Sequence, residues 1–285
     1  MVKQYKSRVV DNLLKRKLEG IGAVLIEGPK LCGKTTTAEQ FSKSILYVAN
    51  PQERQQNLKM AEIDPSVLLK GEIPRLLDEW QIAPMLWDAV RFEVDHRGVP
   101  GQFILTGSAL PAEKDKIFHT GTGRIARLKM RTMALYESGE SNGDISLKQL
   151  FAGEKNLSGV NELTLEEIAY LVCRGGWPTA CLQEGDIALD RAFDYYDAIV
   201  NEDITRADGV NRSSERAKLL MRSYARSQGT QTSTDAIRND MVVNDSNSID
   251  TKTVQSYIDA LKQIFVIEDM PAWNPNLRSK TAIRT

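Results

Sequence analysis

The stretch EGPKLCGKTTTAEQF, residues 27–41, decides the fold of this chain. It fits the pattern G-x-x-x-x-G-K-[ST], with its fixed positions at Gly28, Gly33, Lys34 and Thr35. The apolar run before the pattern predicts a buried strand over 23–26, and the run after it predicts a helix over 35–45. Strand, loop and helix in this order are the context in which the pattern binds phosphate groups.

Each residue type in this loop has a chemical reason. Glycines let successive backbone N–H groups turn inward as a nest for an anion, and the helix that follows adds the positive end of its dipole. Lys34 would reach the β and γ phosphates of a nucleotide, and the Thr35 hydroxyl would ligate Mg²⁺. The sequence therefore predicts a nucleotide-binding loop made of Gly28, Pro29, Lys30, Leu31, Cys32, Gly33, Lys34, Thr35 and Thr36.

Two alternatives stay open at this loop. The first is that the pattern is a glycine turn with a surface lysine and binds nothing. The second concerns Cys32, which precedes a helix N-terminus that could favour its thiolate and make it a redox switch. The competing interpretation of Cys32 is a variable residue that only fills the loop.

Composition narrows the class of protein. The chain has 285 residues, of which 41% are hydrophobic and 26% charged, which predicts a folded protein of two or three domains. Its net charge of −1 argues against a protein that coats nucleic acid over its whole surface. Three cysteines without a CxxC pair and two histidines argue against a disulfide scaffold or a zinc site. No long apolar run and no secretory signal stand in the sequence, so we expect a cytoplasmic protein that does not interact with membranes.

A pair of carboxylates follows the second predicted strand. In EIPRLLDEWQ, residues 72–81, an apolar strand over 73–77 ends in Asp78 and Glu79. Adjacent side chains at a strand end point to opposite sides, so Asp78 would hold Mg²⁺ while Glu79 would face the attacking water as general base. The alternative is an acidic cap between a strand and a helix.

Two further elements complete the predicted site. A strand over 103–105 ends in Thr106, Gly107 and Ser108, and a hydroxyl of Thr106 or Ser108 at this position could sense the γ-phosphate. In HTGTGRIARLKM, residues 119–130, Arg124 follows a glycine turn and is a candidate arginine finger. The alternative interpretations are an ordinary turn after the strand and a solvated basic residue at the start of the next one.

The order of these motifs carries a resemblance to a known family. The segments GPKLCGKT, RLLDEWQ, FEVDHRGVPGQFILTGSA, GRIARLKMRTMALYE and RGGWPTA resemble the prokaryotic AAA-type ATPases (AAA_14-like) that carry a C-terminal DUF4143 region. The resemblance implies an α/β core that binds ATP with Mg²⁺, a helical lid and a winged-helix segment. It also supports the roles given above to Lys34, Thr35, Asp78, Glu79 and Arg124, and to residues Thr106 to Ser108 in the sensor. Relatives usually continue into a domain that resembles restriction-type nucleases, so we expect this chain, which stops at RSKTAIRT, to be a natural truncation or an engineered piece.

We expect an α/β fold with a parallel P-loop sheet at 1–137, a helical lid at 138–206 and a winged-helix domain at 207–285. The polar connector SGESNGD separates the first two, and Thr164 with Glu167 predicts a capping box at a lid helix. In RGGWPTA, Pro178 belongs either to an element that touches the adenine or to a plain turn that ends a helix. Arg174 would cap that helix or pair with a phosphate.

The last region predicts three helices and two extended segments, in winged-helix order. The third helix would bury Val254, Tyr257, Ile258 and Leu261, which repeat at helical spacing. Its outward residues include only two lysines against one aspartate, a weak electrostatic footprint for DNA. Packing or protein docking is the other interpretation of this helix.

Three functions therefore compete. The first is Mg²⁺-dependent ATP hydrolysis by an AAA-type machine that forms an ATP-dependent homo-oligomer and drives conformational change. The second is a slow nucleotide-gated switch that docks a protein partner. The third is an ATP-controlled regulator that binds DNA through the winged helix. A small-molecule kinase is a more distant fourth, because no acceptor pocket is evident.

Overall fold

The computed structural model describes residues 5–107, 119–243 and 249–270. The chain divides into two compact units, Met1–Asp194 and Tyr195–Thr285. This division falls inside helix α8 (Gly185–Ala198), and the three-part division drawn from the sequence remains a prediction. No helix within the described ranges has both the length and the apolar character needed to cross a membrane.

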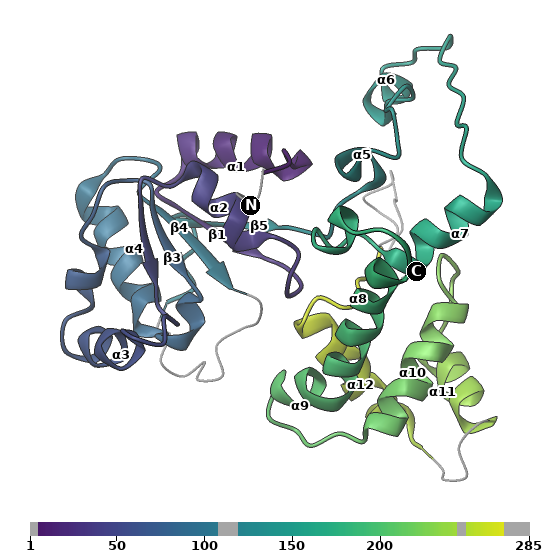
Figure 1. Cartoon of the computed structure of the whole chain (residues 1–285). Helices are drawn as coiled ribbons and strands as arrows, with labels where there is room; N and C mark the ends of the chain where they lie inside the picture. The colour runs from purple at the N-terminus through teal and green to yellow at the C-terminus, as the bar shows by residue number, and fades with distance from the viewer. Residues whose placement is uncertain (1–4, 108–118, 244–248, 271–285) are drawn as a thin grey trace, which may run out of the picture. The chain divides into compact units, whose positions relative to one another are not determined.

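The first unit is built on a five-stranded sheet whose strands all run parallel, as the sequence predicts for an α/β core. In spatial order the strands are β2 (Ser44–Tyr47), β3 (Arg75–Asp78), β4 (Phe103–Gly107), β1 (Ala23–Glu27) and β5 (Ile125–Lys129). The helices that connect them are α1 (Val9–Gly20), α2 (Lys34–Phe41), α3 (Arg54–Ile63) and α4 (Met85–Arg97), with the 3₁₀ helices η1 (Pro65–Leu69) and η2 (Trp80–Ile82). Figure 1 shows the sheet between α1 and α2 on one side and α3 and α4 on the other.

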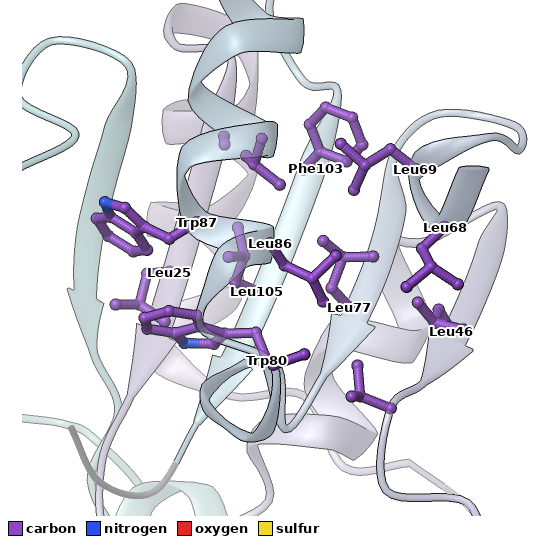
Figure 2. Close-up of a cluster of buried hydrophobic side chains, with 14 of the residues drawn as sticks. Leu25, Leu46, Leu68, Leu69, Leu77, Trp80, Leu86, Trp87, Phe103 and Leu105 are labelled. Atoms are coloured by element: carbon purple, nitrogen blue, oxygen red, sulfur yellow. The ribbon is translucent and has the colours of Figure 1, made fainter. Parts of the chain in front are cut away.

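The two faces of the sheet belong to two separate apolar clusters, because side chains alternate along a strand. Leu25, Leu77, Leu105 and their neighbours pack against η1, η2 and α4, and Figure 2 shows them beside Trp80 and Trp87. The opposite face packs against α1 and α2 through a second cluster, which includes Val24, Ile26, Leu76, Ile104, Leu14 and Ala38. Since Asp78 and Thr106 each stand two residues after a member of the second cluster, their side chains lie on the α2 side of the sheet.

The chain leaves the sheet after the edge strand β5 and forms short helices. These are α5 (Leu135–Ser138), α6 (Leu147–Phe151), α7 (Leu165–Arg174) and the 3₁₀ helix η4 (Ala180–Leu182). The capping box predicted at α7 is confirmed, because Thr164 Oγ1 accepts from Glu167 N at 3.2 Å and Glu167 Oε2 accepts from Thr164 N at 2.7 Å.

The described residues of the second unit form helices joined by loops, without a strand. After the end of α8 it contains a π-helical turn (Ile199–Asp203), α9 (Ile204–Arg206), α10 (Ser214–Arg226), α11 (Thr234–Val243) and α12 (Thr251–Gln263). The apolar face predicted for α12 is confirmed, and it packs in the core of this unit through Val254, Tyr257, Ile258 and Leu261. The two extended segments predicted after α12 are IFVIEDMPAW at 264–273 and SKTAIRT at 279–285. No strand is present within residues 264–270, and 271–285 lie outside the described residues, so a winged helix is not confirmed.

A buried arginine stabilises the second unit. Arg212 donates to both carboxylate oxygens of Asp208, at 2.6 and 2.7 Å, and to the backbone carbonyl of Ile204 at 3.1 Å. Its guanidinium also lies 5.6 Å from the ring centroid of Tyr257 in α12. The residue therefore joins the chain before α10 to the helix at the centre of the unit.

We predict that Leu105→Ala lowers the free energy of unfolding of the first unit by about 2–5 kcal/mol. Leu105 is fully buried in the central strand β4, and its loss leaves a cavity between Trp80 and the sheet. The control is Leu165→Ala, whose side chain is 82% exposed and whose loss should cost less than about 0.5 kcal/mol. Urea denaturation followed by tryptophan fluorescence measures both, and equal effects would contradict this description of the core.

Candidate nucleotide-binding site

The loop between β1 and α2 has the backbone that the pattern requires. A Cβ atom at Gly28 would lie 2.0 Å from the carbonyl oxygen of Met130, so only glycine fits between the loop and the chain after β5. Gly33 precedes the first residue of α2 with φ 101°, a left-handed conformation that favours glycine. Both glycines are thus needed for the path of the chain, whatever the loop binds.

Lys34 lies inside the curve of this loop. Its Nζ donates to the carbonyl oxygens of Gly28 at 2.9 Å and Pro29 at 2.7 Å, and the residue is only 6% exposed. Burial lowers the pKa of the Lys34 ammonium, although nearby carboxylates act in the opposite direction. Because an anionic oxygen is a stronger acceptor than a neutral carbonyl, a phosphate here would offset the cost of burying this charge.

The structure brings Thr35, Asp78 and Thr106 together. Asp78 Oδ1 accepts from Thr35 Oγ1 and from Thr106 Oγ1, each at 2.6 Å. The two strand residues are register partners in the parallel pair of β3 and β4, and Thr35 stands in the first turn of α2. Three residues that the sequence assigned to one site therefore share a single carboxylate oxygen.

These oxygen donors suit Mg²⁺, which prefers hard oxygen ligands and keeps most of its waters. Within residues 5–107, 119–243 and 249–270, no group of three or more His, Cys, Asp or Glu could hold a metal by itself. One carboxylate and one hydroxyl fit a site in which phosphates and water supply the remaining ligands.

Glu79 lies directly after the strand in a left-handed backbone conformation, with φ 56° and ψ 42°. Such a conformation is uncommon for a residue other than glycine and is frequent at ligand sites. Its Oε2 accepts a hydrogen bond from Nε2 of Gln81, and the other amide atom of Gln81, Oε1, is buried without a hydrogen-bond partner. The sequence by itself gives no role to Gln81, whose only signal is its place in the motif DEWQ.

Cys32 is fully buried, and its Sγ lies 3.7 Å from the carbonyl oxygen of Met130. Burial raises the pKa of this thiol and outweighs the opposing effect of Lys34 and Arg8. The residue therefore favours the thiol form and packs inside the loop. This supports the packing interpretation over the redox switch.

Arg124 does not lie near the loop of its own chain. It precedes β5, at the amino end of the parallel sheet, whereas the loop follows the carboxyl end of β1. A strand of five residues separates the two edges by about 16 Å. Arg124 is exposed and donates to Asp95 Oδ1 of α4 at 2.8 Å, and this hydrogen bond holds the pKa of Asp95 below its usual value.

The segment RGGWPTA reaches the loop. A Cβ atom at Gly33 would lie 3.5 Å from Cγ of Pro178. The segment is held there because the carbonyl oxygen of Gly176 accepts from Met133 N at 2.6 Å. Arg174 is buried and donates to Glu140 Oε1 at 2.7 Å, so it is an ion-pair partner within the first unit. Ser108, the other candidate sensor, lies outside the described residues.

A residue that the sequence did not single out also touches the loop. Arg8 is 7% exposed and donates to the carbonyl oxygen of Cys32 at 2.9 Å. It stands just before α1 without any motif around it, so nothing in the sequence identifies it.

Comparison with known families matches two separate regions of the chain to two different families. Residues 21–138 match the model of the AAA domain family, AAA_14. Residues 165–285 match a domain of unknown function, DUF8612. The DUF4143 region that the resemblance implied is not matched; the comparison finds DUF8612 in its place.

A solved structure and two curated proteins are also similar to this chain. A Walker-type ATPase of Pyrococcus abyssi has a similar fold, with a TM-score of 0.52 and 16% identity over 92% of this chain and 91% of its own. Two uncharacterized proteins, of Mycobacterium bovis and Mycobacterium tuberculosis, are each 28% identical over 132 residues. The match covers 46% of this chain and 30% of each relative.

Proposed function

We propose that this chain binds ATP with Mg²⁺ at the loop 28–35 and hydrolyses it. The observation that carries the proposal is the convergence of Thr35 and Thr106 on one oxygen of Asp78, beside a buried Lys34. A lysine, a hydroxyl, a strand-end carboxylate and a second hydroxyl are the groups that phosphoryl transfer in P-loop enzymes uses. The AAA domain family at residues 21–138 supports the same chemistry.

Each side chain has a separate task in this proposal. Lys34 binds the β and γ phosphate oxygens, and Thr35 and Asp78 would hold Mg²⁺, which neutralises phosphate charge when it is bound. Glu79 orients the attacking water and accepts its proton. Thr106 senses the γ-phosphate, because its hydroxyl and that of Thr35 bind the same carboxylate oxygen of Asp78. Pro178 covers the nucleotide-binding loop at Gly33.

We further propose that Arg124 acts on the nucleotide of a neighbouring subunit. Its position at the amino end of β5 removes it from the loop of its own chain, and its exposure leaves it accessible to another copy. Subunits in such an assembly would pack head to tail, with the amino edge of one sheet against the carboxyl edge of the next. The ion pair with Asp95 would open when Arg124 turns to the neighbour.

A slow nucleotide-gated switch is the alternative. It is favoured by the contact of the RGGWPTA segment with the loop, which could transmit nucleotide binding to a protein partner. An ATP-controlled DNA regulator remains the third candidate. It is weaker because Lys262 of α12 is paired with Asp269 at 2.6 Å, which reduces the positive charge available to phosphates.

The first test of the proposal is Lys34→Ala. The change removes the buried charge aimed at the phosphates, so we expect lost turnover and weaker binding of ATP, measured by phosphate release and by titration with a fluorescent ATP analogue. Lys43→Ala, an exposed lysine beyond α2, is the control and should behave as wild type. Unchanged affinity and rate in Lys34→Ala would contradict the proposal.

The second test separates the two carboxylates. Glu79→Gln keeps the shape of the side chain but removes the base, so turnover should fall about 10²–10⁴-fold while nucleotide remains bound. Asp78→Ala should instead raise the Mg²⁺ concentration needed for half-maximal turnover. Glu62→Gln, an exposed position in α3, controls for the loss of one charge. If Glu79→Gln hydrolyses ATP at the wild-type rate, Glu79 is not the base.

The third test concerns assembly. Turnover per subunit should rise with protein concentration, and Arg124→Ala should abolish this rise, because an arginine supplied in trans contributes about 10³–10⁵ in rate. Mixing Arg124→Ala with Lys34→Ala subunits should restore part of the activity, since one supplies an intact loop and the other an intact arginine. Turnover that does not depend on concentration, together with a fully active Arg124→Ala, would show that Arg124 is only a surface residue.

A further inference from the structure

Arg8 is hydrogen-bonded to three parts of the first unit that lie far apart in the sequence. Its Nη1 donates to the carbonyl oxygen of Cys32 at 2.9 Å, in the phosphate loop, and its Nη2 donates to the carbonyl oxygen of Arg131 at 2.9 Å, after β5. Its Nε donates to Glu137 Oε1 at 3.0 Å, in α5. One planar guanidinium therefore sets the distance between the loop and the two segments behind it.

Glu137, the ion-pair partner of Arg8, is fixed by burial and by further hydrogen bonds. Both side chains of the ion pair are buried, with exposed fractions of 5% for Arg8 and 6% for Glu137. The carboxylate also accepts from the backbone N–H groups of Val9 at 2.6 Å and Ala134 at 2.7 Å. Burial alone would raise the pKa of Glu137, but these hydrogen bonds together bring it below its usual value. The ion pair is thus intact at neutral pH and is lost only as pH falls through that lowered pKa.

The guanidinium of Arg8 also lies beside the start of α2. A Cβ atom at Gly33 would lie 3.3 Å from Arg8 Nη1, so this cation lies against the N-cap of α2, at the positive end of the helix dipole. Lys34 adds a second buried cation at the same helix start. An anion bound in the loop would relieve the repulsion between these charges.

The carbonyl that Arg8 binds belongs to the loop itself. A nest for phosphate forms only if the backbone N–H groups of the loop turn inward, which requires the carbonyl groups between them to turn outward. Arg8 is the outward partner of the Cys32 carbonyl, immediately before Gly33 and Lys34. Without Arg8, the Cys32 carbonyl would be buried without this hydrogen-bond donor, which is unfavourable, and the peptide would no longer be held in this orientation.

We propose that Arg8 is a positioning residue for the phosphate loop, which it holds in the nucleotide-binding conformation through the Cys32 carbonyl and couples to α5 through Glu137. The inference rests on the proposed function, since a loop that binds no nucleotide needs no such support. The contact continues beyond α5, because Glu140, two residues after the end of α5, is paired with Arg174. Movement of the segment 135–178 is therefore transmitted to the loop, and nucleotide binding is transmitted back.

The test compares Arg8→Lys with Arg212→Lys. Arg212 is a matched control, because it is also a buried arginine that binds one carboxylate and backbone carbonyls, but in the second unit. A lysine at position 8 keeps the charge and cannot span Glu137, Cys32 and Arg131 at once. We expect Arg8→Lys to weaken the affinity for ATP with Mg²⁺ about 10-fold to 100-fold, with a larger effect on KM than on kcat. Arg212→Lys should lower the melting temperature and leave affinity unchanged.

A second measurement does not depend on nucleotide. Hydrogen exchange of the backbone amides over 28–34 should be faster in Arg8→Lys and in Glu137→Gln than in wild type, and unchanged in Arg212→Lys. Both Arg8→Lys and Glu137→Gln are conservative substitutions, so the comparison does not need the more disruptive Arg8→Ala. Wild-type exchange over 28–34 together with wild-type affinity in Arg8→Lys would overturn the inference. The proposed function falls separately, if the wild-type protein itself binds no ATP.

Discussion

The candidate site depends on one constraint: β1, β4 and β3 are neighbouring parallel strands, so the residues at their carboxyl ends meet at one edge of the sheet. This arrangement brings Asp78 beside Thr106 in register, and it places the loop after β1 at the same edge. Thr35 then donates to the oxygen that Thr106 also uses. A slip of β3 by one residue would turn Asp78 to the face that packs against α4, where neither hydroxyl can reach it.

The second property of the site is buried positive charge. Lys34 and Arg8 are each less than a tenth exposed, and both lie at the start of α2, where the helix dipole is itself positive. Burying cations is costly unless they are paired or hydrogen-bonded, and here they bind backbone carbonyls and the carboxylate of Glu137. The nucleoside triphosphate of the proposed function would bring further negative charge to this helix start. These cations would lower the pKa of the Cys32 thiol, but burial raises it by more, which is consistent with a packing role for Cys32.

Packing and family matching divide the chain at different places. The first compact unit ends at Asp194, whereas the match to DUF8612 begins at residue 165, in α7. Helix α7 and most of α8 therefore belong to the first compact unit but lie in the region that matches DUF8612. Pro178, which lies beside Gly33 of the loop, therefore stands in the region that matches DUF8612, a domain of unknown function.

Local patterns in the sequence were sufficient for several features. The strand, the glycines and Lys34 of the loop, the capping box of α7 and the apolar face of α12 all depend on residues within a few positions of one another, and propensity and periodicity act at that range. The α/β class followed from the alternation of strands and helices. The two extended segments of the winged helix stay a prediction, because strand pairing depends on partners far along the chain and residues 271–285 lie outside the described residues.

Tertiary structure alone decided which of the predicted residues meet. The sequence by itself determined that Asp78 and Thr106 each end a strand, but only the spatial order of the sheet makes those strands neighbours. The sequence also shows that Arg124 follows a glycine turn. Because β5 runs parallel to β1, however, Arg124 lies at the amino ends of the strands, opposite the loop. The ion pair of Arg8 and Glu137 joins residues 129 positions apart, with no motif around either. Periodicity and spacing carry no information over such distances, because the contact is set by how the elements pack and not by the chain between them.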